Sequence, residues 1–500
     1  MSKTREEPPP PPDGIESPSS DHREARLAKL DALKGSGVDA YKLGFERSHQ
    51  IDKVLQAHAD LAPETETQEQ VRIAGRLLTL RRHGKIAFAD LRDQSGQIQL
   101  FARAELLDAG FEAFTQLDLG DWVGAWGRVV TTRKGELSVL VEGFEILSKS
   151  LRPLPEKFHG LKDVEMRYRQ RYLDLIANPE AMQLLTARSG TVAAIRSWLE
   201  GRGFIEVETP ILQPIPGGAL AKPFKTFHET LGIDLYLRIA PELYLKRLVV
   251  GGVEKVFEIN RNFRNEGVSV SHNPEFTMLE LYEAFGDYNS MAVLLEEMCC
   301  AVATQVMGST DVTWGDSTIS LKPPFRRARL IDLVEEAGTA TDGDLKHECE
   351  RLGVPFDPKW SWGKLLLEIY EKTVEPNLMQ PTFVMDYPLD CSPLAREHRS
   401  DPRFTEHLDL VIAGMEIGVA YSELTDPIEQ RKRFEDQAVA REAGDDDAHR
   451  VDEDFLRALE YGMPPTGGLG FGIDRFVMVL TGQTSIREVI LFPSMRPEVL

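Results

Sequence analysis

The stretch from Phe257 to Ala284 limits the possible folds of this 500-residue chain more than any other part of it. Phe257, Ile259 and Phe263 recur with period two and most residues between them are polar, which predicts a strand with one apolar and one polar face. A turn-prone loop rich in Gly, Ser and Asn follows, and residues 276–282 alternate again. The sequence therefore predicts an antiparallel β-hairpin.

The polar face of this hairpin has two possible explanations. Most polar strand faces are simply solvated, because antiparallel sheets commonly keep one face in water. Here that face mixes arginine, carboxylates and aromatic residues, rather than the lysine, glutamate and threonine typical of exposed strands. This mixture favours a binding site over a solvated surface.

Three segments resemble the motifs of class II aminoacyl-tRNA synthetases. The hairpin carries FRNEG and HNPEFTMLELY, which are similar to the second motif in the form found in bacterial lysyl-tRNA synthetases. Thr191–Leu212 resembles the first motif, an interface helix and a strand, and Gly467–Gly482 resembles the third, a strand and a helix. The resemblance extends from about Arg26 to Pro497 and implies an enzyme that joins lysine to tRNA.

Composition narrows the class of protein. The formal charge of −22, from 58 basic and 80 acidic residues, by itself speaks against a nucleic-acid partner. Binding depends on local charge, however, and residues 72–157 carry a slight excess of basic side chains. The four cysteines lack metal-ligand or disulfide spacing, which indicates a reducing cytoplasm and no zinc site. No apolar run approaches the ~18 residues of a membrane span, so we expect no membrane association.

The N-terminal part is expected to hold a helical extension and a small barrel. Residues 1–20 are rich in Pro, Ser and acids and predict a disordered tail. Residues 21–64 predict two helices, the first capped by Asp21. Residues 65–152 contain about five short strands and one helix, Glu105–Gln116, which is typical of an OB-type β-barrel. Such barrels bind single-stranded nucleic acid by stacking bases on aromatic rings in a basic groove.

Residues 153–500 are expected to form a catalytic domain, so that the whole chain is an α+β protein. The resemblance implies an antiparallel sheet flanked by helices. The alternative of a dinucleotide-binding fold is disfavoured, because the repeated βαβ rhythm and a Walker loop are missing and too few residues follow Gly472. A segment over about 314–379 separates the motifs and predicts a helical insertion of unassigned role.

The resemblance assigns an ATP site to the hairpin and its surroundings. The carboxylate of an amino acid must attack the α-phosphorus of ATP, so the site must neutralise two anions and hold them in line. Arg264 is implied to bridge the α-phosphate and the substrate carboxylate, since its planar fork suits both. Glu266 is expected at the adenine amino group and Phe276 beneath the ring. His272 and Arg475 are expected at the outer phosphates.

Two acids are implied to hold magnesium beside the phosphates. Asp409 and Glu416 lie seven residues apart, a spacing that fits one face of a helix or neighbouring positions on strands. Mg²⁺ prefers carboxylate and phosphate oxygens. The resemblance therefore implies Mg²⁺ as the cofactor and ATP as a substrate.

Selectivity for lysine requires carboxylates, because a desolvated ammonium without a partner is costly. The resemblance places Glu280, Tyr282 and Glu423 around the ε-ammonium. It places Glu242 at the α-amino group, and Gly217 where the backbone approaches the substrate closely. An enzyme for aspartate or asparagine would need a cation or an amide at these positions, so Glu280 and Glu423 argue against those relatives.

One position departs from the pattern of the family. Where the family usually has Asn-Gly between the two acids of this motif, the chain has Val419 and Ala420, between Glu416 and Glu423. Valine cannot hydrogen-bond to the substrate carboxylate. Either Arg264 or another group makes that contact, or the lysine is held more weakly.

In the barrel, the resemblance implies that the anticodon of the tRNA is read by one stacking ring and three hydrogen-bonding side chains. These are Phe88, Arg81, Gln99 and Glu136.

The resemblance as a whole implies ATP-dependent ligation of L-lysine to tRNA(Lys) through a lysyl-adenylate, by a homodimer. Val192, Ile195 and Leu199 form the apolar stripe expected at its two-fold interface. A relative that lysylates a protein is disfavoured, because such relatives lack the barrel. A non-catalytic RNA-binding or regulatory descendant is the alternative from another class, but it would be expected to have lost the ATP residues, which are all present.

Overall fold

The computed structural model of the protein describes residues 20–155, 161, 163–219, 221–442 and 451–496. The chain divides into two compact units, which we call the barrel unit and the sheet unit. The barrel unit comprises Met1–Arg167, Tyr172–Asn178 and Pro497–Leu500, and the sheet unit comprises Tyr168–Arg171 and Pro179–Arg496. The predicted disordered tail lies outside the described residues except for Ser20, which begins the first helix.

Five strands close the barrel unit in the order β1-β2-β3-β5-β4. Their bounds are Glu66–His83, Ile86–Arg92, Gln97–Arg103, Trp122–Thr131 and Leu137–Ser148 for β1 to β5. Alternate residues such as Ile73, Leu91 and Leu100 fill the interior, because successive side chains of a strand point to opposite faces. The predicted OB-type barrel is confirmed.

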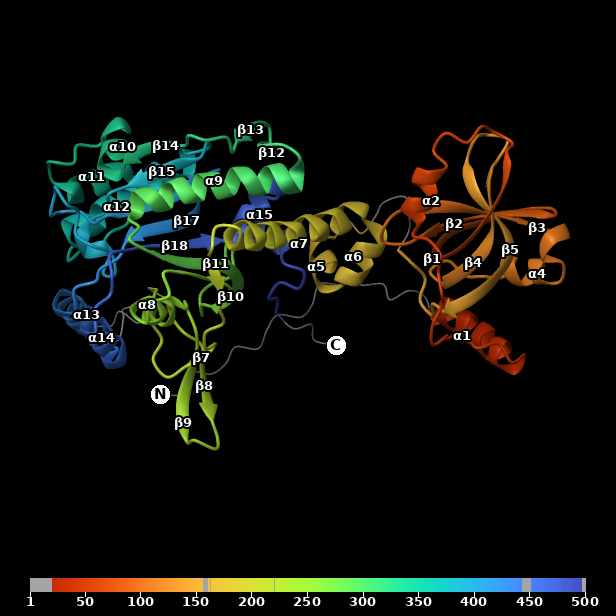
Figure 1. The fold of residues 1–500 in the computed structure, drawn as a ribbon, viewed down its shortest axis with the longest axis horizontal. Helices are drawn as coiled ribbons and strands as arrows, with labels where there is room; N and C mark the ends of the chain where they lie inside the picture. The colour runs from red at the N-terminus through yellow and green to blue at the C-terminus, as the bar shows by residue number, and fades with distance from the viewer. Residues whose placement is uncertain (1–19, 156–160, 162, 220, 443–450, 497–500) are drawn as a thin grey trace. The chain divides into compact units, whose positions relative to one another are not determined.

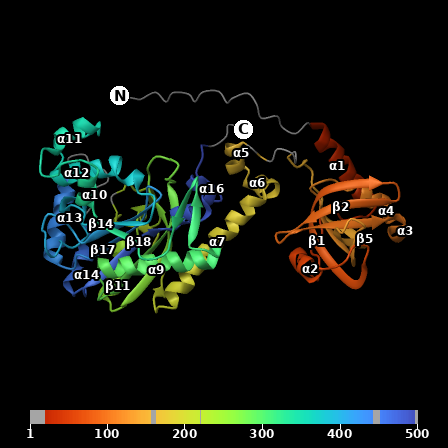
Figure 2. The ribbon, with the colours of Figure 1, turned by 90° about the horizontal axis from the view of Figure 1, so that it is seen from above.

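Short helices flank the barrel. Helices α1 (Ser20–Gly35) and α2 (Ile51–Ala57) lie against different sides of it (Figures 1 and 2). The single helix expected over Glu105–Gln116 is instead two, α3 (Ala104–Leu107) and α4 (Gly110–Thr115). The break comes at Asp108, whose φ of 46° cannot continue a right-handed helix. Two further helices follow the barrel, α5 (Val164–Arg169) and α6 (Arg171–Ala177).

The sheet unit is built on eight strands in the order β14-β15-β16-β17-β18-β11-β10-β6. The bounds from β14 to β6 in that order are Arg326–Arg329, Thr382–Met385, His407–Ile412, Met415–Ser422, Thr466–Gly472, Glu275–Ala284, Lys255–Phe263 and Ile205–Glu206. The strands between β15 and β10 are antiparallel, and the two outermost pairs are parallel. The predicted hairpin is β10 and β11, which lie between β18 and the edge strand β6, with Glu258 opposite Glu280.

Two long helices, α7 (Pro179–Glu200) and α9 (Tyr288–Met307), and the shorter α15 (Ile473–Thr481) cover one face of the sheet. Their apolar residues pack on Leu281, Leu410 and Phe471 of the strands. By length and composition alone, α9 could cross a membrane, but half of that window is buried inside the protein. Figure 1 shows α9 and the smaller helix α8 (Glu242–Val250) on opposite sides of β17, β18 and β11. The face toward α8 is therefore the one left for a site.

The apolar stripe expected at a dimer interface does not point outward. Ile195 and Leu199 are fully buried in the core beneath α7, and Val192 packs partly buried against the same core. The prediction that this stripe forms the interface is wrong, because the helix needs it to dock on its own sheet.

The remaining elements form smaller groups. Helices α10 (Leu330–Glu336), α11 (Leu345–Leu352) and α12 (Trp362–Thr373) gather beside β14 and β15, as both views in Figures 1 and 2 show. The segment 314–379 thus holds these helices together with β14, a strand of the main sheet. Two small sheets are formed by β12 (Asp311–Trp314) with β13 (Ser317–Ser320), and by β7 (Leu212–Gln213), β8 (Lys225–His228) and β9 (Ile233–Leu237). Helices α13 (Pro427–Glu442), α14 (Glu453–Glu460) and α16 (Ile486–Val489) complete the unit.

Candidate active site

A strip of glycines lies along the centre of the open face of the sheet. Gly468, Gly470 and Gly472 of β18 pair with Tyr282, Glu280 and Met278 of β11. On the other side of β18, Gly470 pairs with Val419 of β17. Because glycine has no side chain, β18 forms the floor of a trough walled by β11 and β17. We call this feature the glycine trough.

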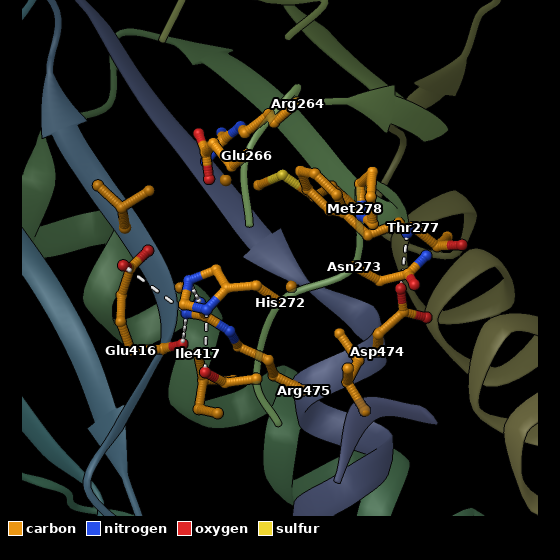
Figure 3. Close-up of a pocket in the computed structure, with 18 of the residues that line it drawn as sticks. Arg264, Glu266, His272, Asn273, Thr277, Met278, Glu416, Ile417, Asp474 and Arg475 are labelled. Carbon is orange, nitrogen blue, oxygen red and sulfur yellow. Dashed lines mark hydrogen bonds and ion pairs between the residues drawn. The ribbon is translucent and has the colours of Figure 1, made fainter. Parts of the chain in front are cut away.

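A pocket opens at one end of the glycine trough and brings together all five residues predicted to bind ATP. It is lined by residues of the β10–β11 loop, β11, β17, β18 and α15, among them Arg264, Glu266, His272, Phe276, Glu416 and Arg475. Figure 3 shows Arg264 and Glu266 at one side of this pocket, and His272, Glu416 and Arg475 at the other. Segments that are far apart in the sequence thus meet at one cavity.

Arg264 is arranged to meet an anion. Its guanidinium carbon lies 5.2 Å from the centre of the Phe276 ring, so the cation stacks near an aromatic wall of the pocket. Its Nε is buried and has no hydrogen-bond partner among the described residues. A buried donor without a partner costs about 1–3 kcal/mol, so this atom favours a bound acceptor such as a carboxylate or phosphate oxygen.

His272 and Arg475 are paired at the other side of the pocket. Arg475 Nη2 lies 3.1 Å from His272 Nε2, and Arg475 Nη1 donates to the Glu416 carbonyl at 2.6 Å. Ser269 Oγ and Ser271 Oγ lie 2.9 and 3.0 Å from His272 Nδ1. Burial, with Arg475 and Arg264 nearby, lowers the pKa of His272. The ring is therefore held neutral beside two permanent cations, in surroundings suited to an anion.

Asp474 of α15 holds in place the strand that carries Phe276. The Thr277 amide donates to Asp474 Oδ2 at 2.8 Å, and Asp474 also forms an ion pair with Arg188 of α7. The sequence reasoning did not identify Asp474, although its position beside Arg475 in the third motif was a usable signal.

At the opposite end of the glycine trough lies a buried group of acids, which we call the acidic recess. It consists of Glu242, Glu280 and Glu423 with Tyr282 and Lys246, all of which are almost fully buried. Glu280 and Tyr282 come from β11, Glu423 directly follows β17, and Glu242 and Lys246 lie one turn apart on α8. Tyr282 donates to Glu280 Oε1 at 3.0 Å. The structure therefore brings together four of the five residues predicted for lysine, Glu242, Glu280, Tyr282 and Glu423.

Two glycines let the backbone approach the acidic recess. A Cβ on Gly468 would collide with Glu423 Oε1 and come within 2.6 Å of the Tyr282 ring. A Cβ on the predicted Gly217 would lie 2.7 Å from Leu243 of α8, so this glycine allows its loop to pack on the helix that carries Glu242.

The two predicted metal ligands lie on neighbouring strands, β16 and β17, and not on a helix. Asp409 lies opposite Val419 in the strand pairing. Its Oδ1 lies 2.8 Å from Nε2 of His407, and the other ring nitrogen of this histidine, Nδ1, lies 2.8 Å from Ser392 Oγ. Glu416 lines the pocket with its side chain 47% exposed. No cluster of three or more metal-binding side chains occurs among the residues that the structure describes. Two carboxylates on neighbouring strands, one of them lining the pocket, fit Mg²⁺ that takes its remaining oxygen ligands from water or a bound ligand rather than a metal held by protein alone.

A second pocket lies on the surface of the barrel and is lined by all four predicted anticodon residues, Arg81, Phe88, Gln99 and Glu136. Phe88 stacks on Phe101 with ring centres 4.9 Å apart and an angle of 8° between the planes. Arg103 lies over Phe101 at 4.8 Å. The sequence reasoning missed Phe101 and Arg103, although their place on the strand paired with Phe88 was a possible signal.

Comparison with known proteins agrees with this geometry. Residues 163–496 match the family model described as tRNA synthetases class II (D, K and N), and residues 71–147 match that of the OB-fold nucleic acid binding domain. A lysine–tRNA ligase of Moorella thermoacetica is 52% identical over 480 residues, covering 95% of this chain and 97% of the relative. One from Xanthomonas oryzae pv. oryzae is 52% identical over 485 residues, covering 95% and 96%. One from Pelotomaculum thermopropionicum is 51% identical over 495 residues, covering 97% and 96%.

Both family models fall on the segments that carry the two pockets, and the relatives align over nearly their full lengths. The chain belongs to the family of class II lysine–tRNA ligases.

Proposed function

We propose that this protein ligates L-lysine to tRNA(Lys) in two steps. The lysine carboxylate attacks the α-phosphorus of ATP, the bond to the leaving diphosphate breaks, and lysyl-adenylate forms. A terminal hydroxyl of the tRNA then attacks the lysyl carbonyl carbon, and AMP leaves. The observation that carries the proposal is the glycine trough, which joins an anion-binding pocket to a buried acidic recess.

In the first step, Arg264 holds the two anions together. Its buried Nε, which has no hydrogen-bond partner in the part of the chain that the structure describes, and its place in the pocket support contacts to both the α-phosphate and the lysine carboxylate. Glu266 contacts the adenine amino group and Phe276 supports the ring. His272 and Arg475 face the outer phosphates. Val419 lies in the wall of the glycine trough and offers no hydrogen bond, so Arg264 is the group that carries the substrate carboxylate.

Lysine lies along the glycine trough with its side chain toward the acidic recess. Glu280, Tyr282 and Glu423 surround its ε-ammonium, Glu242 pairs with its α-ammonium, and Gly217 lets the neighbouring loop approach. Support comes from the burial of these carboxylates, since an isolated carboxylate in such a place requires a cationic partner.

Asp409 and Glu416 are the residues that would hold Mg²⁺. When bound, the ion supplies positive charge to the phosphate oxygens of ATP. The contact from His407 keeps the Asp409 carboxylate oriented.

The barrel, within residues 65–152, reads the anticodon, and residues 153–500 catalyse both steps. Phe88 stacks on a base, and Arg81, Gln99 and Glu136 bond to base edges. Residues 21–64 serve as an N-terminal extension of the barrel, and 314–379 as an insertion in the catalytic domain. The four cysteines are free, in keeping with a cytoplasmic enzyme.

We also propose a homodimer, supported by a different surface from the predicted stripe. Ile205, Ile211 and Leu212, just after α7, have 56%, 44% and 46% of their surface exposed. Several exposed apolar residues within one short segment favour an interface. Sedimentation should give twice the mass of the 56.2 kDa chain, and a fully active monomer would contradict the proposal.

The function is tested by ATP–diphosphate exchange with each of the twenty amino acids in turn. Lysine should support exchange far better than any other. Exchange with aspartate or asparagine in preference to lysine would contradict the proposed substrate while leaving the class II fold intact.

A further inference from the structure

Lys246 is the one residue of the acidic recess that no step above uses. Its side chain has 0% exposure, and its Nζ lies 2.6 Å from Glu242 Oε1 and 2.5 Å from Glu423 Oε2. It also lies 5.8 Å from the centre of the Tyr282 ring. A lysine of the chain itself is thus buried among the carboxylates proposed to bind the substrate lysine.

The ammonium of Lys246 forms its ion pair with only one carboxylate oxygen of Glu423, Oε2. Among the described residues, Glu423 Oε1 and Glu280 Oε2 are buried without a hydrogen-bond partner. Oε1 of Glu423 lies over Gly468, at the floor of the glycine trough, and Oε1 of Glu280 is already taken by Tyr282. Each carboxylate is therefore fixed through one oxygen, by Lys246 or Tyr282, and presents the other.

The charges of the acidic recess match a doubly cationic ligand. Glu258 of the neighbouring strand is neutralised by Arg238 at 2.6 Å. Glu242, Glu280 and Glu423, when ionised, together with Lys246 leave two negative charges uncompensated. Lysine brings two ammonium groups, so the bound state is balanced. Without Lys246, three buried carboxylates would face two cations, and one of them would stay protonated.

We propose that Lys246 is a positioning and specificity-determining residue, which holds Glu242 and Glu423 in place, keeps them ionised and sets the charge of the acidic recess to match lysine. The proposal rests on the function given above. Lys246 acts through the carboxylates and touches neither ATP nor the reacting carboxylate.

The titration of the acidic recess follows from this arrangement. Burial raises the pKa of Glu423 to about 7, and Lys246 opposes that rise while Glu242 adds to it. Burial and Glu242 likewise raise the pKa of Glu280, and burial raises those of Tyr282 and Tyr421. Burial would lower the pKa of Lys246, but Glu242 and Glu423 outweigh it, and the pKa lies above its usual value. Because a protonated Glu423 cannot pair with an ammonium, lysine affinity should fall as the pH drops through about 7.

The test is ATP–diphosphate exchange with Lys246→Gln, which removes the charge but keeps a hydrogen-bond donor. At neutral pH the KM for lysine should rise on the order of tenfold or more, with little change in the KM for ATP. The midpoint of the pH profile of kcat/KM for lysine should move up by about one unit or more, because a nearby cation lowers a carboxyl pKa by roughly 1–3 units. Lys246→Arg keeps the charge and should keep the wild-type midpoint.

Lys255→Gln is the matched control, since Lys255 pairs with Glu283 at 2.7 Å but is 38% exposed and lies outside the acidic recess. It should leave the KM and the midpoint unchanged. A folded Lys246→Gln protein with wild-type KM and midpoint would overturn the inference. If that variant does not fold, Lys246→Arg decides: an unchanged midpoint supports the inference, and an upward shift of about one unit with the charge retained overturns it. Wild-type protein in the same assay separates the two claims, because failure to activate lysine there would count against the proposed function itself.

Discussion

At the scale of single residues, the chemistry depends on buried polar atoms whose partners are not other residues of the chain. Arg264 Nε, Glu280 Oε2 and Glu423 Oε1 are such atoms among the described residues, and all three lie along the glycine trough or at its ends. Buried polar atoms without a protein partner are tolerated where a bound ligand supplies the hydrogen bond. The cation of Arg264 and the carboxylates of Glu280 and Glu423 are thus placed to meet the two ends of an amino acid with a cationic side chain: Arg264 its carboxylate, and the glutamates its ammonium.

Replacing Arg264 tests the cationic end of this line. Arg264→Ala should reduce kcat/KM for lysine activation, because it removes the cation shared by both reacting anions. The expected loss of transition-state stabilisation is about 3 kcal/mol or more. Circular dichroism and thermal unfolding should remain close to wild type, since the side chain lines the pocket. Wild-type exchange in a folded variant would show that another group carries the reaction.

Most residues of the site could be predicted from the sequence, but Lys246 could not. Glu242 and Lys246 are four residues apart on a helix, a spacing usual for exposed ion pairs. Only the packing of α8 against β10 and β11 turns this pair inward, and that packing is long-range information. The structure brings the predicted residues together, but the roles of all of them remain predictions that mutagenesis must test.

At the scale of secondary-structure elements, the β10–β11 hairpin could be predicted from its alternating apolar residues, and the strand–helix unit of β18 and α15 from the resemblance of Gly467–Gly482 to the third motif. The boundaries of other elements could not. The helix expected over Glu105–Gln116 is interrupted at Asp108, whose backbone φ is positive. The spacing of apolar residues does not predict such a break. The stripe on α7 was identified as apolar, but its partner was not, since a helix gives the same pattern whether it packs on its own sheet or on another chain.

The floor that the glycines of β18 form can be tested by replacing one of them with alanine, which adds a single methyl group. Gly468→Ala would place its Cβ against Glu423 Oε1 and the Tyr282 ring, so the KM for lysine should rise by on the order of tenfold or more. Gly470→Ala would meet only the ends of Met278 and Val419, at 3.3 and 3.4 Å, and should have a smaller effect. Steady-state exchange kinetics compares the two. Equal effects would contradict the view that Gly468 specifically shapes the acidic recess.

At the scale of the whole molecule, the two compact units hold the two pockets separately. The barrel pocket contains a stacked Phe88–Phe101 pair, whereas the pocket of the sheet unit contains the residues proposed to bind ATP. We therefore expect tRNA recognition and lysine activation to be separable by mutation.

Phe88→Ala should weaken charging of tRNA by about 1–3 kcal/mol in kcat/KM, the value of one lost base stack, and leave ATP–diphosphate exchange unchanged. Phe227→Ala, at an aromatic ring of the sheet unit that is 55% exposed, serves as a control and should leave both half-reactions unchanged. Equal loss of both half-reactions in Phe88→Ala would indicate that Phe88 supports the fold of the barrel.

The central claim is that a buried acidic recess selects lysine, and the KM for lysine of Glu423→Gln in ATP–diphosphate exchange tests it most directly. Removing one partner of a buried charge pair costs roughly 3–5 kcal/mol, whereas an exposed carboxylate contributes under about 1 kcal/mol. Glu283→Gln breaks an ion pair on the same strand as Glu280, outside the acidic recess, and is the matched control. The account predicts a steep rise in the KM for lysine for Glu423→Gln alone, with the KM for ATP little changed. A wild-type KM for lysine in a folded Glu423→Gln protein would contradict it.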